Sequence, residues 1–404
     1  MRDAIAHIPY GCYWASPFAR WQGSLAVFHA LELVADVTRE RLAAFAIDTR
    51  QLEFGVLGST VPQRGSFYGL PWVAGLAGAP HLAGPTISQA CATGARVLAT
   101  AAHEITARGA SAGLALTADR TSNSPHIYYP APSAQGGVGE TEDWILANFE
   151  ADPFAGVSMV ETAENVARKY GVSRERQDDI ALLRYAQYET ALAEDRAFQR
   201  RYMPTLATPS RKRGAPGGTV MGDEGVYSVD ERKLRSLAPA REDGSVTYAT
   251  QTHPADGNAG VIVADAETAA TLSQDSSIQV RILGFGQART EIAHMPEAPV
   301  PACRDALKAC ELSIDEIDLV TSHNPFAVND VVFHLETGFP LERMNIRGCS
   351  LVYGHPQGPT GLRLIIELIE SLAERGGGRG LFQGCAAGDT AMAIVIAVED
   401  GRAA

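Results

Sequence analysis

Two cysteines and a histidine lie in glycine-rich segments of this 404-residue chain: Cys91 in SQACATG, His355 in GHPQGPTG and Cys385 in QGCAAGD. A thiol can attack a carbonyl carbon, and an imidazole can take up the thiol proton. A second thiol can exchange a proton with carbon. Together these side chains form a complete set for acyl transfer through a thioester, which points to an enzyme.

The surroundings of Cys91 suit a reactive thiol. The residue follows the β-prone letters ISQ and precedes a helical pattern, so we expect its sulfur at a helix N-terminus. Unpaired N–H groups and the positive end of the helix dipole favour a thiolate there. The same local pattern fits a buried structural cysteine equally well.

His355 and Cys385 each lie in a segment that excludes regular structure. Three glycines and two prolines around His355 predict a fixed loop ahead of a helix. Cys385 ends the strand-like LFQG, in a turn of small residues whose backbone N–H groups can meet an oxyanion. Taken singly, each side chain is more often structural than catalytic, so the case depends on their combination.

The elements around Cys91 alternate between strand and helix. EFGVLG and AGLALT read as buried strands, separated by a glycine- and proline-rich loop and a helix from Cys91 to Ala107. Small residues lie on every side of that helix, which predicts burial between layers. This is the pattern of an α/β fold.

Residues 122–240 differ from this pattern. They hold a polar, glycine-rich stretch at 131–140, helical segments at 159–170 and 174–194, and the basic loop SRKRGAPGG at 210–218. We interpret this region as an insertion that covers a site.

The α/β pattern resumes at residue 246. VIVAD, VRILGFG, IDLVTSH and AMAIVIAV read as strands, and residues 301–310 and 360–375 read as helices. A helix followed by a strand ends both halves of the chain, which indicates a duplicated unit.

Composition excludes several classes of protein. The formal net charge of -13 disfavours a nucleic-acid partner or an anionic membrane. The six cysteines lie far apart, without the spacing of a zinc site, so we expect no metal and free thiols in a reducing cytosol. The N-terminus lacks a signal-like apolar stretch, and the longest apolar run, at 391–398, is far shorter than the ~20 residues of a membrane span. We therefore expect a cytoplasmic protein.

Several motifs together resemble the thiolase family, the enzymes that make or cleave 3-oxoacyl-CoA. Residues 160–187 are similar to the thiolase segment TAENVA followed by SRExQD, and residues 299–320 resemble the stretch leading into its NEAF or HDCF motif. GHPQGPTG resembles GHPxGxSG, and the segment around Cys385 resembles CxGGGxG. The likeness covers nearly the whole chain.

The resemblance implies a role for each reactive side chain. Cys91 would be acylated by substrate, His355 would take its proton, and Cys385 would exchange a proton with the α-carbon of the second acyl-CoA. His355 with His323 would stabilise the enolate, and the amides of Cys91 and Ala387 the tetrahedral intermediate.

Two motifs depart from the family pattern. Residues 323–326 read HNPF, so a histidine comes first, as in the HDCF subgroup related to sterol-carrier thiolases, while Asn324 replaces an acid. Residues 385–389 read CAAGD in place of CxGGG. The methyl group of Ala387 would narrow the space at the oxyanion turn that it forms with Gly388.

Substrate contacts are also implied by the resemblance. Met159 matches a methionine that borders the acyl pocket, and Thr252 matches a serine that touches pantetheine. Arg211 and Arg213 lie in the region that covers coenzyme A in thiolases, where they would bind phosphate or form a solvated loop. Cys349 lies close in sequence to His355, and packing is its favoured role.

The resemblance also implies the architecture. We expect a five-layered αβαβα fold of two similar halves: residues 1–121 with 242–275, and residues 276–404. Residues 122–241 would form an inserted loop domain covering coenzyme A. The substrates are CoA thioesters, no cofactor is tightly bound, and a homodimer is implied, with a tetramer or a complex with a second subunit as further possibilities.

Two other interpretations stay open at this point. A ketosynthase or a hydroxymethylglutaryl-CoA synthase-like enzyme would use a Cys/His/His set, which His323 and His355 could supply, but Cys385 and TAENVA argue against it. A thiolase-like subunit that binds acyl-CoA and needs a partner chain is motivated by the altered NEAF and CxGGG positions. Retention of all three reactive side chains argues against it.

Overall fold

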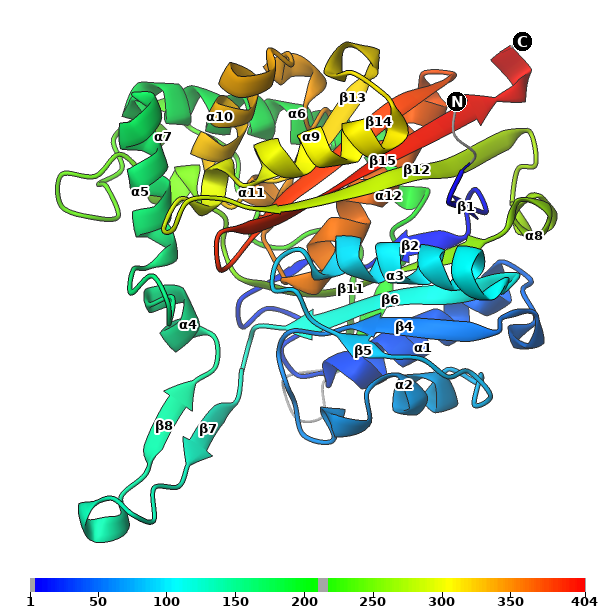
Figure 1. Ribbon diagram of the computed structural model, residues 1–404, viewed down its shortest axis with the longest axis horizontal. Coiled ribbons are helices and arrows are strands. Elements are labelled where there is room, and N and C mark those ends of the chain that lie inside the picture. Colours follow the sequence, from blue (N-terminus) through cyan, green and yellow to red (C-terminus); the bar gives the residue numbers. More distant parts are fainter. Residues whose placement is uncertain (1–3, 210–216, 404) are drawn as a thin grey trace.

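The computed structural model describes residues 4–209 and 217–403. Within these residues, an 11-stranded sheet runs in the order β13-β14-β15-β12-β1-β11-β6-β4-β5, and β2 and β3 also pair with β11. β1 (Ala6–Ile8) pairs antiparallel with β11 on one side and β12 on the other. This short strand joins two layers of sheet, one from each half of the chain (Figure 1).

The N-terminal half of the chain forms the first layer of the sheet. Its strands are β2 (Tyr13–Ala15), β3 (Ala19–Arg20), β4 (Phe54–Gly58), β5 (Thr86–Ile87), β6 (Ala112–Arg120) and β11 (Ala255–Ala264). β4 runs parallel to β5 and β6, and β11 runs antiparallel to β6. Helices α1 (Ala30–Ala44) and α2 (Leu70–Leu76) cover the outer face (Figure 1).

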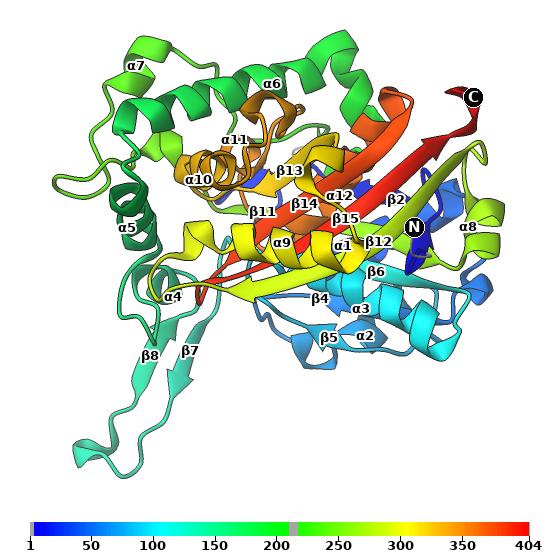
Figure 2. The same cartoon turned by 45° about the horizontal axis from the view of Figure 1, so that its top comes forward.

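The C-terminal half forms the second layer. Its strands are β12 (Ile278–Arg289), β13 (Leu319–His323), β14 (Gly377–Ala386) and β15 (Thr390–Asp400). β13 pairs with β14 in parallel, and the other neighbours pair antiparallel. Helices α9 (Pro299–Cys310) and α10 (Ala327–Thr337) lie on its outer side (Figure 2).

Two helices fill the space between the layers. α3 (Thr93–Arg108) and α12 (Gly358–Glu374) contact each other and strands of both halves. They approach at glycines: a Cβ added to Gly94 would lie 2.6 Å from the carbonyl oxygen of Gly358. The five-layered α/β arrangement expected from the sequence is confirmed, and the small residues of α3 are buried as predicted.

Residues 122–254 form a less regular side of the molecule. The hairpin of β7 (His126–Tyr129) and β8 (Glu140–Asp143) projects from the body at the lower left of Figure 1. This region also holds α4 (Leu146–Glu150), α5 (Met159–Tyr170), α6 (Arg174–Arg200), β9 (Leu206–Thr208), β10 (Gly218–Val220) and α7 (Glu231–Arg235). Two short helices lie outside it, α8 (Ala266–Leu272) after β11 and α11 (Ser350–Tyr353) before the His355 loop.

Two boundaries differ from the sequence-based expectation. α3 begins at Thr93 rather than at Cys91, because Ala90 has a positive φ of 44° and Cys91 lies in a turn. The helix expected to end at residue 194 continues as α6 to Arg200, although its residues 193–196 have non-helical dihedrals. No helix in the described part of the chain is long and apolar enough to cross a membrane.

Candidate active site

A cavity of about 720 Å³ opens where the two halves meet the irregular region. Cys91 and His355 line it from the two halves, together with Ala387 of the turn after β14. Met159 and Thr252 line it as well. Five predicted site residues thus share one cavity, although they are spread over most of the chain.

Cys91 lies in a tight turn between β5 and α3. The preceding Ala90 has φ 44°, in a region that residues with a side chain seldom adopt. Strained backbone of this kind persists only where the surrounding structure holds it, and it is common at functional sites. The turn leaves the Cys91 side chain partly exposed to the cavity.

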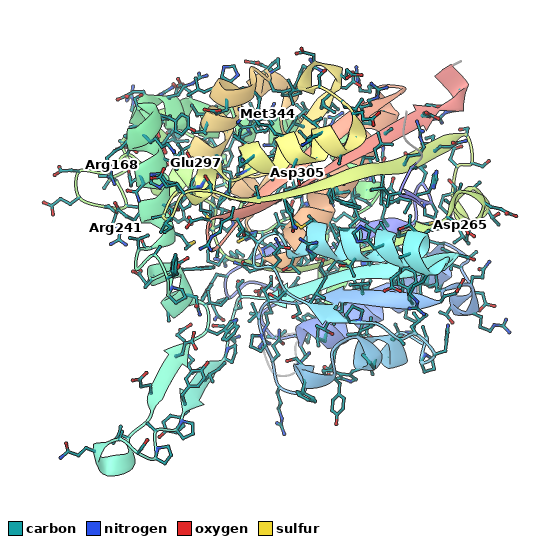
Figure 3. The ribbon with its side chains drawn as sticks, viewed as in Figure 1. Arg168, Arg241, Asp265, Glu297, Asp305 and Met344 are labelled. Carbon is teal, nitrogen blue, oxygen red and sulfur yellow. The ribbon has the colours of Figure 1, made fainter. Side chains whose placement is uncertain are left out.

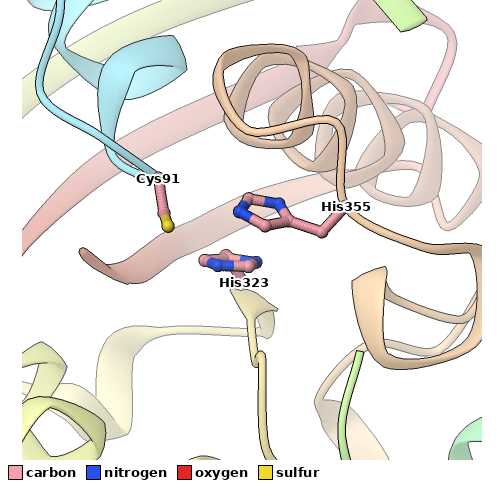
Figure 4. A group of neighbouring side chains, drawn as sticks. All are labelled: Cys91, His323 and His355. Carbon is pink, nitrogen blue, oxygen red and sulfur yellow. The ribbon is translucent and has the colours of Figure 1, made fainter. Parts of the chain in front are cut away.

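His323 and His355 lie beside this thiol. His323 ends β13 and His355 lies in the loop before α12, and their rings stack with centroids 4.0 Å apart and planes 23° apart (Figure 4). Their Nδ1 atoms are fixed by the hydroxyl groups of Ser350, at 2.9 Å from His323, and Thr360, at 2.7 Å from His355. Both imidazoles are therefore held in one orientation.

The free nitrogens of the two imidazoles are turned toward the thiol. Among the described residues, neither Nε2 atom has a hydrogen bond of ordinary geometry, although both are buried. One ligand atom of each imidazole and the Sγ of Cys91 all lie within 4.8 Å of one another. A buried polar atom without a hydrogen-bond partner lowers the stability of the fold. Two such atoms side by side are therefore consistent with a site that binds a substrate oxygen. One thiol and two imidazoles are also donor types that can hold a metal ion. The spacing of these three residues in the sequence did not reveal that they lie together.

Cys385 lies one residue beyond the point where the histidine strand pairs with β14. His323 pairs with Gly384, so the parallel register places the Cys385 segment beside the imidazole. The side-chain amide of Asn329 donates to the Cys385 sulfur at 3.3 Å. Burial raises the pKa of Cys385 most, and its electrostatic interaction with Cys91 raises that pKa further. The structure therefore brings the three predicted reactive side chains together.

Burial keeps these groups neutral. Desolvation raises the pKa of Cys91 to about 11 and that of Cys385 well above its usual value. It lowers the pKa of His355 to about 3 and that of His323 well below the ordinary range of imidazole. The expectation that the helix N-terminus would favour a Cys91 thiolate is therefore wrong, because the loss of solvent around the thiol outweighs the helix dipole.

The turn after Cys385 supplies backbone donors. Burial raises the pKa of Cys91 most, and the backbone amides of Ala387 and of Cys91 itself lower it in part. Gly388 follows with φ 79°, a conformation that favours glycine. The Asp389 carboxylate then accepts hydrogen bonds from the amides of residues 293–294 at 2.9 and 3.0 Å. The departure CAAGD thus keeps the amide donor and anchors the turn.

A buried ion pair accounts for the HNPF sequence. Asp330 pairs with Arg184 at 2.8 Å, and both side chains are fully buried. The amide of Asn324 donates to the same carboxylate at 2.7 Å. An acid at position 324, as in HDCF, would place a second carboxylate there, so the amide removes a repulsion that burial would make severe.

The predicted substrate contacts fall in three places. Met159 is the first residue of α5, after its N-cap Ser158, and lines the cavity. Thr252 also lines it, and its hydroxyl donates to the Ser350 carbonyl at 2.6 Å. Arg211 and Arg213 lie outside the described residues. Cys349 is fully buried, as its packing role predicted.

Sequence reasoning missed several residues of the cavity. Gln357 accepts a hydrogen bond from the Cys91 thiol at 3.3 Å, and its place inside GHPQGPTG was a usable signal. Trp144 lines the wall, with its indole N–H donated to the Thr60 carbonyl at 2.9 Å. Arg241 lies at the α5 side of the molecule (Figure 3) and also lines the cavity. No local pattern marked these two.

A cavity lined by a thiol and a neutral imidazole, with a second imidazole and a second thiol buried beside them between two α/β layers, defines an acyl-transfer enzyme. The family model for the thiolase N-terminal domain matches residues 14–267, and that for the thiolase C-terminal domain matches residues 276–398. The chain therefore belongs to the thiolase family and is an acyl-CoA C-acyltransferase.

Individual relatives agree with this assignment. An acetyl-CoA acetyltransferase of Pseudomonas aeruginosa is 30% identical over 93% of this chain and 95% of its own length. The Bacillus anthracis acetyl-CoA acetyltransferase structure superposes with a TM-score of 0.89 at 26% identity, covering 98% of this chain and 100% of its own. The fold also matches human mitochondrial 3-ketoacyl-CoA thiolase, with a TM-score of 0.89 at 23% identity, over 98% of this chain and 99% of that one.

Proposed function

We propose that this enzyme makes or cleaves 3-oxoacyl-CoA through an acyl group carried on Cys91. The observation that supports this most strongly is the approach of Cys91, His323 and His355 within 4.8 Å, where neither Nε2 atom has a hydrogen-bond partner among the residues that the structure describes. A thioester carbonyl placed there meets a nucleophile, a base and hydrogen-bond donors at once.

In the first half-reaction, His355 takes the proton of Cys91 as the sulfur attacks the incoming thioester. The Nδ1 of His355 is fixed by Thr360, so Nε2 is the nitrogen that accepts the proton. The amides of Cys91 and Ala387, which already point at the sulfur, stabilise the tetrahedral oxyanion. Coenzyme A leaves with the proton, and the acyl group stays on Cys91.

In the second half-reaction, a proton moves between Cys385 and the α-carbon of the second acyl-CoA. The Asn329 amide donates to the Cys385 sulfur and stabilises its thiolate form. The Nε2 atoms of His323 and His355 hold the enolate oxygen in the tautomers that carry the proton on Nε2, which the Ser350 and Thr360 hydroxyl groups allow by donating to Nδ1. The histidine at position 323, in place of the asparagine of NEAF, aligns the site with the HDCF subgroup of sterol-carrier thiolases.

The substrates themselves supply coenzyme A, and no tightly bound cofactor enters this scheme. Pantetheine would pass Met159 and Thr252, which line the same cavity as Cys91 and His355. Human mitochondrial 3-ketoacyl-CoA thiolase has been solved in complex with CoA, and this chain matches it with a TM-score of 0.88. Residues 122–241, proposed as the loop domain, contribute Trp144, Met159 and Arg241 to the cavity.

We propose a homodimer that covers the outer edge of the N-terminal layer. β5 is the last strand of the sheet order, and the Thr86 hydroxyl accepts from the Leu70 amide, just after the exposed pair Phe67 and Tyr68. These side chains are 94% and 72% exposed. An unpaired strand edge beside exposed aromatics suits a second copy of the chain. Light scattering should show a dimer that Phe67→Glu with Tyr68→Glu dissociates.

Mass spectrometry tests the covalent step. Incubation with acetyl-CoA, or with 3-oxoacyl-CoA plus CoA, should add one acyl group to the peptide that contains Cys91. Cys91→Ala should lose the label and turnover together, whereas Cys12→Ala, which removes a thiol buried far from this peptide, should keep both. Normal turnover by Cys91→Ala would contradict the proposal.

A further inference from the structure

Gln357 occupies the position that the motif GHPxGxSG leaves open. In this chain it is 4% exposed and lines the same cavity as the nucleophile. An uncharged amide in a buried loop needs hydrogen-bond partners. The partners of this side chain therefore indicate what it does.

The backbone of Gln357 is strained. Its φ of 64° and ψ of −111° lie in a region suited to glycine, at the residue that precedes α12. Neighbouring contacts hold it there: the buried Asp119 carboxylate accepts from the Gly358 amide at 3.0 Å. The Gly358 carbonyl packs against Gly94 of α3. A residue kept in such a conformation, where glycine would be easier, indicates a use for its side chain.

The side-chain carbonyl oxygen of Gln357 faces both reacting groups. It accepts from the Cys91 thiol at 3.3 Å. His355 lies two residues before Gln357, and one of its ring nitrogens lies within 4.8 Å of the Cys91 sulfur. Burial lowers the pKa of His355 most strongly, and the Gln357 side chain raises that pKa in part. That direction is expected of an oxygen that accepts from the N–H of an imidazolium. One amide oxygen thus serves the proton donor and the proton acceptor.

We propose that Gln357 is a catalytic residue whose amide oxygen accepts the Cys91 thiol at rest and the His355 imidazolium after proton transfer. In the transfer, the S–H bond of Cys91 breaks, an N–H bond forms at Nε2 of His355, and the sulfur keeps the electron pair with which it attacks. The inference rests on the proposed role of Cys91 as nucleophile.

This role answers a difficulty set by burial. Burial favours the neutral forms of both reacting groups, so the proton transfer creates a thiolate and an imidazolium where few water molecules can solvate them. The amides of Cys91 and Ala387 stabilise the thiolate. The Gln357 dipole stabilises the cation, since a preorganised dipole costs no reorganisation during the step.

Alkylation of Cys91 by iodoacetamide tests the inference without using acyl transfer. The rate is followed by peptide mass spectrometry across pH in the full-length enzyme. Gln357→Met, which keeps the side-chain length and removes the oxygen, should slow alkylation near neutral pH by about 10- to 100-fold, the value of a hydrogen bond to a charged group. Gln279→Met makes the same change on the exposed face of β12 and should alkylate at the wild-type rate.

Gln357→Gly separates reactivity from folding. Glycine relieves the strain at φ 64°, so the melting temperature should stay level or rise while Cys91 alkylation slows as in Gln357→Met. Wild-type alkylation rates in both variants would overturn the inference. Thiolysis of acetoacetyl-CoA by the unmodified enzyme is measured separately, so failure of the proposed function is distinguished from failure of the role of Gln357.

Discussion

Cys91 follows β5 in one half of the molecule and Cys385 lies near the end of β14 in the other half, yet their surroundings differ. Cys91 lies in a strained turn, is partly exposed and lines the cavity. Cys385 lies within β14 and is fully buried, and it is not among the described residues that line the cavity. The first thiol can therefore meet a bound thioester directly, whereas the second reaches only carbon that has been delivered beside the acylated Cys91.

The hydrogen-bond partners of the two thiols follow the same division. Backbone amides and the Gln357 carbonyl surround Cys91, which suits a sulfur that must lose a proton and then hold an oxyanion nearby. Cys385 accepts from one side-chain amide, that of Asn329. Two similar halves thus use one kind of side chain for two tasks, and burial with local donors sets the difference.

The largest expected effect comes from removing the second thiol. Cys385→Ala should still become acylated at Cys91, because the first half-reaction does not need it, while overall turnover falls by more than about 10³-fold. Intact-protein mass spectrometry after acetyl-CoA and a coupled turnover assay check the two steps. Loss of acylation in this variant would show that the two thiols do not divide the work in this way. Cys310→Ala, in α9, is the matched control and should keep both steps.

His323 should matter less than either thiol. His323→Ala removes one of two enolate donors and should lower kcat by about 10²- to 10³-fold, the usual loss for one such donor. His323→Asn, which restores the first letter of NEAF, should recover part of that loss through a bound water. His103→Ala, an exposed histidine of α3, controls for the change of residue type. Unchanged kcat in His323→Ala would remove the imidazole from the scheme.

Arg241 lines the same cavity as Cys91, whereas Cys385 is not among the described residues that line it. Its guanidinium is 47% exposed, donates to Ser158 at 2.7 Å and is the kind of group that binds phosphate. Arg241→Met should raise KM for CoA by about 3- to 10-fold with little change in kcat, since exposed ion pairs are weak. Arg168→Met, on α5 and paired with Glu161, should leave KM unchanged. Equal KM values in the two variants would exclude a role for Arg241 in binding CoA.

The comparison of the two thiols also shows what the sequence could predict. Glycine-bounded motifs identified Cys91, His355 and Cys385, because a reactive side chain on a fixed turn leaves a local signal. The strands of both halves followed from short apolar runs. The Cys91–Gln357 contact joins residues 266 positions apart, and no local pattern encodes such a pairing.

The direction of the Cys91 pKa was likewise beyond the sequence. The helix N-terminus was visible in the pattern, but the burial that outweighs it depends on how His323, Phe326 and Ala387 pack around the turn. Position 324 shows the same limit, because the reason for Asn324 is the distant ion pair of Arg184 with Asp330. The protonation state of a side chain thus depends on its tertiary surroundings, whereas a sequence motif shows only which residue types are present.

The smallest expected effect is in the pH dependence of acylation. The pKa of His355 is lowered to about 3, so its neutral form, the base, predominates at every pH above that value. The pKa of Cys91 is raised to about 11, so the thiol keeps its proton until well above neutral pH. The neutral pair is therefore the main species throughout, and kcat/KM for release of CoA from acetyl-CoA should change by less than about twofold between roughly pH 5 and pH 8.

A site with a preformed thiolate and imidazolium would instead depend on an imidazole that titrates near its ordinary pKa of about 6.5. Stopped-flow measurement of the first CoA released checks this, with samples returned to neutral pH to confirm that the enzyme stays intact. A tenfold fall in kcat/KM on acidification across that range would contradict the neutral thiol and imidazole of Cys91 and His355. It would also show that burial does not shift their pKa values in the stated directions.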